Sequence, residues 1–312
     1  MLALALLWLA PAVVCASQPL PEPAHEGFHH LRSRWAAKTS PDHVALDAMV
    51  PLGIPGLLRA KLAYGPTGKD LEREDARAWL DGCQGPGGKG LVALGRARSN
   101  GEGGVEWPLP RLPVGAYRLV VEVAGDGTRA ESTLRVLPRK SALAIFDVDG
   151  TLTLADPELA ADALRDRKNP RAELWMQARP YPGACELTRA VAERGHAVVY
   201  LTGRPTRLAH VTRRWLEQQG CAPGHVILAV RKRSVLPHEA SVGAHKRAAL
   251  AVLRAQGFGF AYAFGNAATD VTAYAAAGIA ADRTYIIGEH AGELGTRAVK
   301  DAWTEVAKEL GQ

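Results

Sequence analysis

The pattern of hydrophobic and polar positions changes twice along the chain. Between residues 44 and 138, short apolar runs alternate with Gly- and Pro-rich turns, and in 116–123 (AYRLVVEV) apolar side chains occupy every second position. This period of two is typical of strands with one buried face. Turn signals such as Asp126-Gly127 recur at the spacing of a β-sandwich. We therefore predict an immunoglobulin-like β-sandwich over residues 44–138.

From residue 141 onward, continuous apolar strands alternate with helical segments. The expected strands are 143–147, 197–201, 226–230, 260–264 and 284–287. Continuous apolar strands are typical of parallel sheets whose two faces are both covered by helices. We therefore predict a doubly wound parallel α/β domain over residues 141–312. In such a domain, polar side chains that carry chemistry gather at the carboxyl ends of the strands.

The first sixteen residues form an apolar run that precedes a polar lead-in over residues 17–43. The run is shorter than the roughly 20 residues that a spanning helix needs, and the small residues ending at Ala16 fit a signal-peptide cleavage site. A signal peptide over residues 1–16 predicts an exported protein, periplasmic or extracellular, in solution or at a membrane. Because no Lys or Arg precedes the run, an uncleaved anchor, a lipoprotein modified at Cys15 and a misassigned start stay open.

The lead-in contains a short amphipathic pattern. Phe28, Leu31 and Trp35 follow the i, i+3, i+7 spacing of one helix face, and basic side chains and histidines lie around them. One interpretation is an interfacial helix that contacts anionic lipid. The other is a helix that packs on the body of the protein.

Composition and net charge restrict the classes of partner that the protein is expected to bind. Of the 312 residues, 47% are hydrophobic and 22% are charged, which excludes a wholly disordered chain. The net charge of +6 favours acidic partners such as nucleic acid, anionic lipid or phosphorylated small molecules. The tryptophans show no periodic spacing that would stack bases, so we expect no nucleic-acid partner.

Two cysteines fall within the α/β segment. Cys185 is expected at the start of one helix, on the catalytic side of the sheet, and Cys221 after the next helix, on the opposite side. A helix of about ten residues spans roughly 15 Å, whereas the Cα atoms of a disulfide lie within about 7 Å of each other. We therefore predict no Cys185–Cys221 disulfide.

The strongest candidate for chemistry follows the first strand of the α/β segment, in the sequence Asp147-Val148-Asp149-Gly150-Thr151. An aspartate at a strand end can attack phosphorus and form an aspartyl-phosphate. Because an anion then attacks a phosphate dianion, we expect Mg²⁺ on the Asp147 carboxylate and a nearby backbone oxygen. Asp149, in its protonated form, can donate to the leaving oxygen and then activate water.

Later segments supply the other groups that phosphoryl transfer needs. Thr202 and Gly203 follow the second strand, where we expect a helix to begin and its hydroxyl and N–H groups to hold a phosphate. Lys246, placed at the start of the helix before the fourth strand, adds a cation. After the fourth strand, Asn266 can ligate Mg²⁺, and Asp270 can orient Lys246 or a metal-bound water.

In this order, these residues resemble the four motifs of the haloacid dehalogenase (HAD) superfamily of phosphatases. The resemblance covers residues 141–310 and implies a Mg²⁺-dependent phosphatase with a nucleophilic aspartate. The expected catalytic residues are Asp147 and Asp149; the expected phosphate-binding residues are Thr151, Thr202, Gly203 and Lys246; the expected metal-binding residues are Asp147, Asp149, Asn266 and Asp270.

One departure is informative, because most members of the superfamily have Asp where Asn266 stands. The segments AFGNAATDVTAYAAAGI, YLTGRP and DVDGTLT are instead similar to the lipin/Smp2-type (LNS2) branch. That branch contains Mg²⁺-dependent phosphatidate phosphatases, and relatives in phosphatidylinositol-transfer proteins that bind phosphatidate without the nucleophile. Since both aspartates are present, the resemblance implies hydrolysis of phosphatidate or a related lipid phosphate. A non-catalytic phosphatidate-binding module and a phosphatase for soluble esters are the alternatives.

The surroundings of the site bear on its substrate. Only about 30 residues separate Thr151 from Pro182, too few for a large cap domain, so we expect an open site suited to a bulky or membrane-held ester. Basic residues follow the second and third strands, where they are either a collar for an anionic headgroup or membrane or a solvated surface. They are Arg204, Arg207, Arg213, Arg214, Arg231, Lys232 and Arg233.

Overall fold

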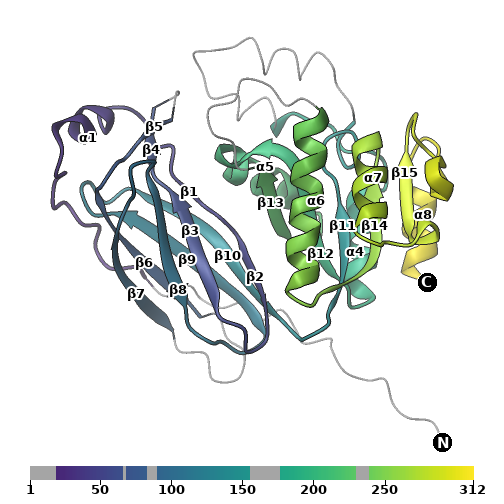
Figure 1. The fold of residues 1–312 in the computed structure, drawn as a ribbon, viewed down its shortest axis with the longest axis horizontal. Helices are drawn as coiled ribbons and strands as arrows, with labels where there is room; N and C mark the ends of the chain where they lie inside the picture. The colour runs from purple at the N-terminus through teal and green to yellow at the C-terminus, as the bar shows by residue number, and fades with distance from the viewer. Residues whose placement is uncertain (1–18, 66–67, 83–89, 155–175, 230–238) are drawn as a thin grey trace, which may run out of the picture.

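Figure 1 shows the computed structural model, in which two units lie side by side along the long axis of the molecule. The structure describes residues 19–65, 68–82, 90–154, 176–229 and 239–312. The predicted signal peptide, most of the segment expected to lack a cap domain, and the basic triplet 231–233 lie outside these residues. Among the helices of the described ranges, none is long and apolar enough to cross a membrane.

The N-terminal unit is built from strands. A three-stranded sheet has the order β1-β3-β8, a five-stranded sheet has the order β2-β10-β9-β6-β7, and β4 pairs with β5. All of these pairs are antiparallel except β10 with β2. The elements are α1 Leu31–Ala36, β1 Val44–Ala45, β2 Ala48–Pro51, β3 Gly56–Lys61, β4 Ala63–Tyr64, β5 Lys69–Asp70, β6 Asp75–Asp81, β7 Leu91–Arg98, β8 Gly104–Leu109, β9 Gly115–Val123 and β10 Arg129–Leu137.

One hydrophobic core joins the two larger sheets of this unit. Leu58 and Trp107 contribute from the three-stranded sheet, and Leu119 and Leu134 from the five-stranded sheet. Tyr117, Leu119, Val121 and Val123 all belong to this core, as the period of two in β9 predicts. Two facing sheets over residues 44–137 are therefore observed, whereas their immunoglobulin-like type stays a prediction.

The C-terminal unit alternates strands and helices. Its sheet has six strands in the order β13-β12-β11-β14-β15-β16, and every pair is parallel. The elements are β11 Ala142–Phe146, α4 Ala184–Glu193, β12 Ala197–Pro205, η1 Thr206–Leu208, α5 Ala209–Gln218, β13 His225–Ala229, α6 Glu239–Ala255, β14 Gly259–Gly265, α7 Ala268–Ala276, η2 Ala281–Arg283, β15 Thr284–Ile287, η3 Glu293–Gly295, β16 Arg297–Val299 and α8 Thr304–Gly311.

The strand order defines where a ligand should bind. The chain moves outward from β11 to β12 and β13 and then returns to the other side of β11 with β14. This reversal creates a switch point between β11 and β14, and open parallel sheets bind ligands outside the carboxyl ends of the strands at such a point. The five strands expected from the sequence are all present. The edge strand β16 was not expected, because its three residues begin with a charged side chain.

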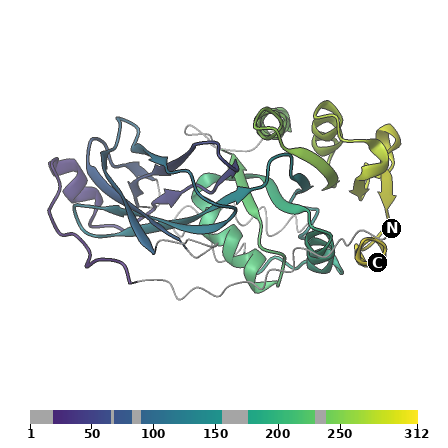
Figure 2. The ribbon, with the colours of Figure 1, turned by 90° about the horizontal axis from the view of Figure 1, so that it is seen from below.

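Both faces of this sheet are buried, as the continuous apolar strands predict. Phe146 packs with Tyr200 and Trp303 on the face that α4 and α8 cover. Ile145 packs on the opposite face with Leu250 and Tyr274, which come from α6 and α7. Figure 2 shows α6 and α7 on one side of the sheet and α4 and α8 on the other.

The two units share a polar junction centred on Asp47, whose side chain is 1% exposed. Asp47 accepts hydrogen bonds from the backbone of Thr133 in its own unit, at 3.0 Å, and of Val226 in β13, at 3.1 Å. Arg213 in α5 pairs with Asp47 at 3.0 Å and also donates to the carbonyl of Ala45 at 2.9 Å. Arg213 therefore fixes the sandwich to the α/β unit, and it belongs neither to a headgroup collar nor to a solvated surface.

The lead-in helix α1 combines both interpretations of its sequence. Phe28 lies just before α1 and packs against the sandwich core, with its ring 6.2 Å from that of Tyr64. Leu31 and Trp35 are 72% and 68% exposed. The segment is therefore docked through Phe28, whereas two apolar side chains of α1 face solvent.

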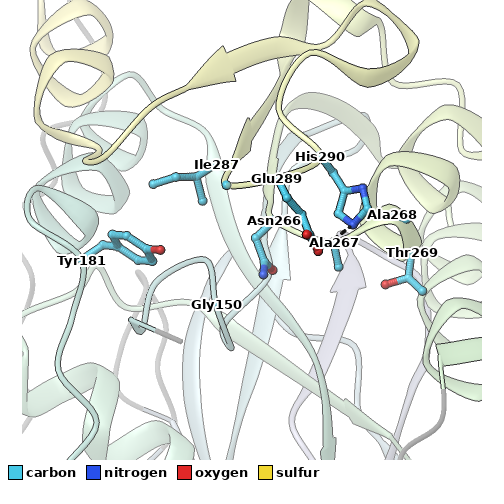
Figure 3. Close-up of a pocket in the computed structure, with 10 residues that line it drawn as sticks. Gly150, Tyr181, Asn266, Ala267, Ala268, Thr269, Ile287, Glu289 and His290 are labelled. Atoms are coloured by element: carbon cyan, nitrogen blue, oxygen red, sulfur yellow. Dashed lines mark ion pairs between the residues drawn. The ribbon is translucent and has the colours of Figure 1, made fainter. Parts of the chain in front are cut away.

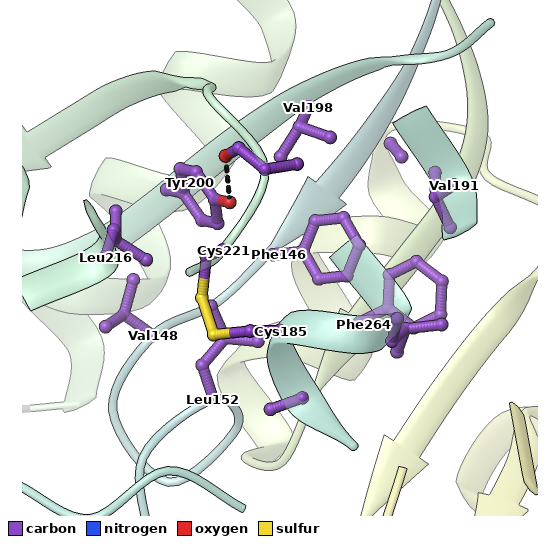
Figure 4. Packing of buried hydrophobic residues seen from close by; sticks show 14 of the residues in the cluster. Phe146, Val148, Leu152, Cys185, Val191, Val198, Tyr200, Leu216, Cys221 and Phe264 are labelled. Atoms are coloured by element: carbon purple, nitrogen blue, oxygen red, sulfur yellow. Dashed lines mark hydrogen bonds between the residues drawn. A yellow bond between two sulfur atoms is a disulfide. The ribbon is translucent and has the colours of Figure 1, made fainter. Parts of the chain in front are cut away.

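The structure contradicts the prediction that Cys185 and Cys221 stay apart, because it joins them in a disulfide with a Cα–Cα distance of 4.2 Å. The prediction assumed that each helix runs the full height of the sheet. Instead, the chain after α5 returns across the middle of β12, where the Tyr200 hydroxyl donates to the Ala222 carbonyl at 2.6 Å. The Ala222 N–H donates to Thr188 of α4 at 2.9 Å, which brings Cys221 to the first turn of α4 (Figure 4).

Loss of this disulfide should destabilise the protein. The cysteines are 36 residues apart, and a cross-link over such a loop contributes about 2–4 kcal/mol by restricting the unfolded chain. We expect Cys185→Ser/Cys221→Ser to lower the free energy of unfolding by this amount in denaturant titrations, with Cys83→Ser as the control. Two free thiols at these positions in the oxidised wild-type protein, measured by mass spectrometry after alkylation, would contradict the assignment.

Candidate active site

The Asp147 carboxylate lies at the switch point and is almost completely buried, with a side-chain exposure of 4%. Its backbone N–H donates to the Phe264 carbonyl of the neighbouring strand at 3.0 Å. Its Oδ1 accepts from the Lys246 ammonium at 2.6 Å, and its Oδ2 accepts from the Thr151 hydroxyl at 3.0 Å. The strand end therefore holds the predicted nucleophile in a fixed orientation.

Lys246 lies between two carboxylates. Its ammonium also pairs with Asp270 at 2.6 Å, and the side chains of Lys246 and Asp270 are 4% and 0% exposed. Burial by itself lowers the pKa of Lys246, but the charges of Asp147 and Asp270 outweigh it and hold that pKa above its usual value. Lys246 is therefore a permanent cation beside the nucleophile.

The helix that carries Lys246 begins earlier than expected. Lys246 lies in the middle of α6 rather than at its start, because α6 begins at Glu239. In the structure Val242 packs on Gly203, where an added Cβ would lie 3.2 Å from both Val242 methyl groups. Gly203 thus allows α6 to approach β12 closely.

Asp270 holds Lys246 and the loop after β14 in place, and its carboxylate is not placed to bind a metal. One of its oxygens accepts from Lys246, and the other accepts from the backbone N–H groups of Asn266 and Ala267 at 3.2 and 3.1 Å. Among the roles expected for Asp270, the observed contacts fit the orientation of Lys246. Its expected role as a direct metal ligand does not fit, because the carboxylate is fully buried and already engaged.

The single cation beside Asp147 does not offset its burial and the two neighbouring carboxylates. Burial raises the pKa of Asp147 to about 7, the charges of Asp270 and Asp149 add to this effect, and Lys246 opposes it. A carboxylate in such a position is stabilised in its charged form by an additional cation.

Oxygen donors next to Asp147 fit Mg²⁺. The Thr151 hydroxyl lies 3.0 Å from both Asp147 Oδ2 and Asn266 Oδ1, so a carboxylate oxygen and an amide oxygen converge on one point. Mg²⁺ prefers such ligands and often binds through one or two carboxylates together with a substrate phosphate. Within the described residues, no cluster of three His, Cys, Asp or Glu side chains could hold a metal. A cation here would therefore depend on Asp147, Asn266, backbone oxygens and the substrate.

Gly150 is required between these donors. Its φ of +78° lies in the left-handed region, and an added Cβ would lie 2.3 Å from the Asn266 amide nitrogen. The expected phosphate-binding residue Thr151 is completely buried, and its hydroxyl bridges Asp147 and Asn266 instead of facing a ligand.

Asp149 is held by an arginine whose role the sequence analysis did not identify. Arg204 Nη2 lies 2.7 Å from Asp149 Oδ1, and Arg204 Nε lies 3.0 and 3.1 Å from the two carboxylate oxygens. The Arg204 side chain is 2% exposed and that of Asp149 is 36% exposed. Arg204 is therefore an internal partner of Asp149 and belongs neither to a headgroup collar nor to a solvated surface.

Thr202 belongs to the same group of side chains. Its hydroxyl donates to Asp149 Oδ2 at 3.0 Å and accepts from the Arg204 N–H at 3.1 Å. The helix expected directly after Thr202 begins only at Ala209, because β12 continues to Pro205. Thr202 thus positions Asp149, whose side chain faces Thr202 and Arg204 rather than Asn266. The expected metal contact of Asp149 stays a prediction.

A hollow of about 310 Å³ lies beside these residues. Figure 3 shows Asn266 and Gly150 on its floor and Tyr181, Ile287, Glu289 and His290 around it. No motif in the sequence indicated Tyr181, Glu289 or His290. Only their position in the chain could have suggested them as site residues. Glu289 and His290 follow β15, and Tyr181 precedes α4, and both segments lie at the carboxyl edge of the sheet.

Fold and site together define the class of this unit as a HAD-like α/β domain. Residues 144–288 match the family model described as the LNS2 domain of PITM 1–3, and this part of the chain is therefore an LNS2-type domain.

Relatives extend the similarity beyond this domain. Over 286 residues the chain is 26% identical to membrane-associated phosphatidylinositol transfer protein 1 of Homo sapiens, covering 88% of this chain and 21% of that protein. Protein retinal degeneration B of Drosophila melanogaster is 24% identical over 288 residues, covering 86% of this chain and 20% of that protein. The chain thus spans about a fifth of the length of these relatives.

A weaker similarity is found among solved structures. A class C acid phosphatase from Bacillus anthracis with tungstate bound is 17% identical, with a TM-score of 0.34, covering 56% of this chain and 74% of that chain.

Proposed function

We propose that the protein is a Mg²⁺-dependent phosphomonoester hydrolase that acts on phosphatidate or a related lipid phosphate. The observation that supports this most is the buried Asp147 carboxylate at the switch point, oriented by Lys246 and Thr151 next to an Asp149 that Arg204 and Thr202 hold. A module that only binds phosphatidate would need neither a fixed nucleophile nor a second fixed carboxylate. The test is Mg²⁺-dependent release of phosphate from vesicles that contain phosphatidate.

The chain supplies the groups for a two-step reaction. Asp147 attacks phosphorus, the bond between phosphorus and the ester oxygen breaks, and an aspartyl-phosphate forms. Asp149 gives its proton to the departing oxygen and then takes a proton from the water that attacks the aspartyl-phosphate. Lys246 stabilises negative charge on the transferred group. Mg²⁺, held by Asp147, Asn266 and a backbone oxygen, would add charge neutralisation for the phosphate.

Arg204 gives Asp149 a more exact position than the sequence indicated. Three contacts from one planar guanidinium fix both carboxylate oxygens, and a bidentate arginine restrains the plane of a carboxylate. For Asp149 to act as an acid, this contact has to loosen when the phosphate is bound.

Membrane-held lipid is the favoured source of the phosphate ester. The named relatives are membrane-associated phosphatidylinositol transfer proteins, and α1 exposes Leu31 and Trp35. Lys38 lies 4.2 Å from the centre of the Trp35 ring, which combines a basic and an apolar group as interfacial helices do. In Figure 1, α1 lies toward the same side of the molecule as the starts of α6 and α7, where the site is.

Membrane contact should depend on Trp35. We expect Trp35→Ala to weaken co-sedimentation with phosphatidate-containing vesicles at both low and high salt, because its contribution is apolar. Neutralising Arg231, Lys232 and Arg233 should weaken it mainly at low salt, since each basic residue near an anionic surface contributes about 1 kcal/mol that salt screens. Leu52→Ala, which removes a 41% exposed side chain elsewhere, is the control. Wild-type protein that stays in the supernatant at low salt would exclude membrane contact and favour a soluble ester.

Export and an immunoglobulin-like type of the sandwich complete the proposal. The Cys185–Cys221 disulfide supports export, because disulfides persist in oxidising compartments such as the periplasm and the extracellular space. The two facing sheets of the N-terminal unit support the immunoglobulin-like type. Through Asp47 and Arg213 this unit fixes α5, which follows η1 and the end of β12 that carries Arg204.

A further inference from the structure

The hollow beside Asn266 is next to the reacting groups but separate from them. It lies between the loop after β11, the loop after β14 and the residues that follow β15, and its volume is about 310 Å³. Asn266 is one of its walls, and the same Thr151 hydroxyl contacts both Asn266 and the Asp147 carboxylate. A phosphate on Asp147 would therefore have its ester oxygen within reach of this space.

Its two sides differ in chemistry. Tyr181 and Ile287 give one side an aromatic ring and an alkyl group. On the other side, Figure 3 shows the Glu289 carboxylate between Asn266 and His290. The side chain of Glu289 is 86% exposed, so its oxygens can accept hydrogen bonds from a ligand. Such a space suits a carbon skeleton that carries hydroxyl donors.

The charges at the rim exclude a second phosphate. His290 lies between two carboxylates, with Nδ1 2.8 Å from Glu293 and Nε2 3.3 Å from Glu289. Both ring nitrogens thus face acidic partners of the protein, and two carboxylates accompany one imidazole. An anionic group of the ligand would be repelled here, whereas O–H groups donate well to carboxylates.

The size of the hollow limits what can enter it. A space of about 310 Å³ lies at the lower end of the range of ligand pockets, which suits a group the size of glycerol. In a phosphate ester of a lipid, we expect the glycerol carbons to lie in this space and the acyl chains to lie outside it.

We propose that this hollow binds the alcohol part of the substrate and selects alcohols with a free hydroxyl group. The inference rests on the proposed phosphatase function and narrows its substrate class to phosphomonoesters of a polyol, either soluble glycerol phosphate or a monoacylglycerol phosphate in a membrane. Glu289 accepts the hydroxyl hydrogen bond, and Tyr181 and Ile287 contact the carbon skeleton. A diacyl lipid such as phosphatidate has no free hydroxyl on its glycerol and is the poorer substrate.

The first test compares matched pairs of esters. Glycerol 3-phosphate and propyl phosphate differ only in two hydroxyl groups, and monoacyl and diacyl glycerol phosphates in mixed vesicles differ in one hydroxyl group and one acyl chain. We expect wild-type kcat/KM to be about tenfold or more higher for the hydroxylated member of each pair, because a hydrogen bond to a charged carboxylate is stronger than one between neutral groups. Whether the soluble or the vesicle pair gives the higher kcat/KM distinguishes a free polyol phosphate from a lipid.

The second test changes the hollow without touching the reacting groups. Glu289→Leu should reduce the preference for the hydroxylated ester to less than about threefold, because the acceptor is lost. Ala268→Trp, which fills the space from an exposed position on α7, should lower kcat/KM for glycerol 3-phosphate about tenfold and for methyl phosphate less than threefold. Ala275→Trp, on an exposed position of the same helix, and Glu305→Leu, at an exposed glutamate of α8, should behave as wild type.

The outcomes separate the inference from the function on which it rests. An active enzyme that shows no preference within the pairs, or whose preference Glu289→Leu leaves unchanged, overturns the hollow as the alcohol site and leaves the phosphatase intact. Equal losses for glycerol 3-phosphate and methyl phosphate in Ala268→Trp also overturn it. Absence of Mg²⁺-dependent phosphate release from every ester overturns the proposed function and this inference together.

Discussion

Asp147→Asn should reduce kcat by about 10⁴-fold or more, since removal of the nucleophile in covalent catalysis leaves only binding and electrostatic contributions. The side-chain volume is kept, and the Asn oxygen can still accept from Lys246, which also keeps its 2.6 Å pair with Asp270. We therefore expect the fold to survive. Steady-state phosphate release measures the activity, and thermal unfolding measures the fold.

The control for this variant is Asp42→Asn. Asp42 lies in the sandwich unit, and burial raises the pKa of its carboxyl to about 6. It contacts none of the reacting groups described above, so activity should stay within about threefold of wild type. A folded Asp147→Asn protein with wild-type Mg²⁺-dependent turnover would show that another group forms the covalent bond to phosphorus.

Asp149→Asn should slow turnover by about 10²–10⁴-fold, the range that general acid–base catalysis supplies. The loss should depend on the leaving group. An ester of a phenol with a low pKa departs without protonation, so its first step should be affected less than that of an alkyl ester. Single-turnover measurements with both esters separate these steps.

Asp149→Asn also removes the charged partner of Arg204, so it should affect stability as well as catalysis. The arginine side chain is 2% exposed, and loss of the partner charge leaves a buried guanidinium that is costly to accommodate. Asp149→Asn should therefore also lower the midpoint of thermal unfolding. If single-turnover rates of the alkyl ester are unchanged, the acid–base role belongs to a different group and Asp149 serves only to hold Arg204.

The sequence predicts the chemistry-bearing loops well because their positions follow from sheet geometry. Asp147 and Asn266 come directly after parallel strands, and the carboxyl ends of neighbouring strands must meet. The structure brings Asp147, Thr151 and Asn266 within hydrogen-bond distance. The positions of the strands alone were thus enough to predict that these residues lie together.

The first residues of helices and the tertiary contacts of side chains were harder to predict from the sequence. The early start of α6 depends on the contact between Val242 and Gly203, two residues far apart in the chain. The Cys185–Cys221 disulfide depends on the path of the chain across β12, which no periodicity encodes. Arg204 could have been found by asking which cation balances Asp149, because it stands two residues after Thr202 at the end of the same strand.

The central claim is that this site hydrolyses a phosphate ester rather than only binding it, and the most direct test is phosphate release from lipid vesicles. Wild-type protein and Asp147→Asn are incubated with vesicles of phosphatidate or its monoacyl form, and with soluble glycerol 3-phosphate, with Mg²⁺ or with chelator. We expect wild-type protein to release phosphate with Mg²⁺ only, and Asp147→Asn to release none while still co-sedimenting with the vesicles. Binding of wild-type protein to the vesicles without release of phosphate from any of these esters would contradict the account and identify the domain as a binding module.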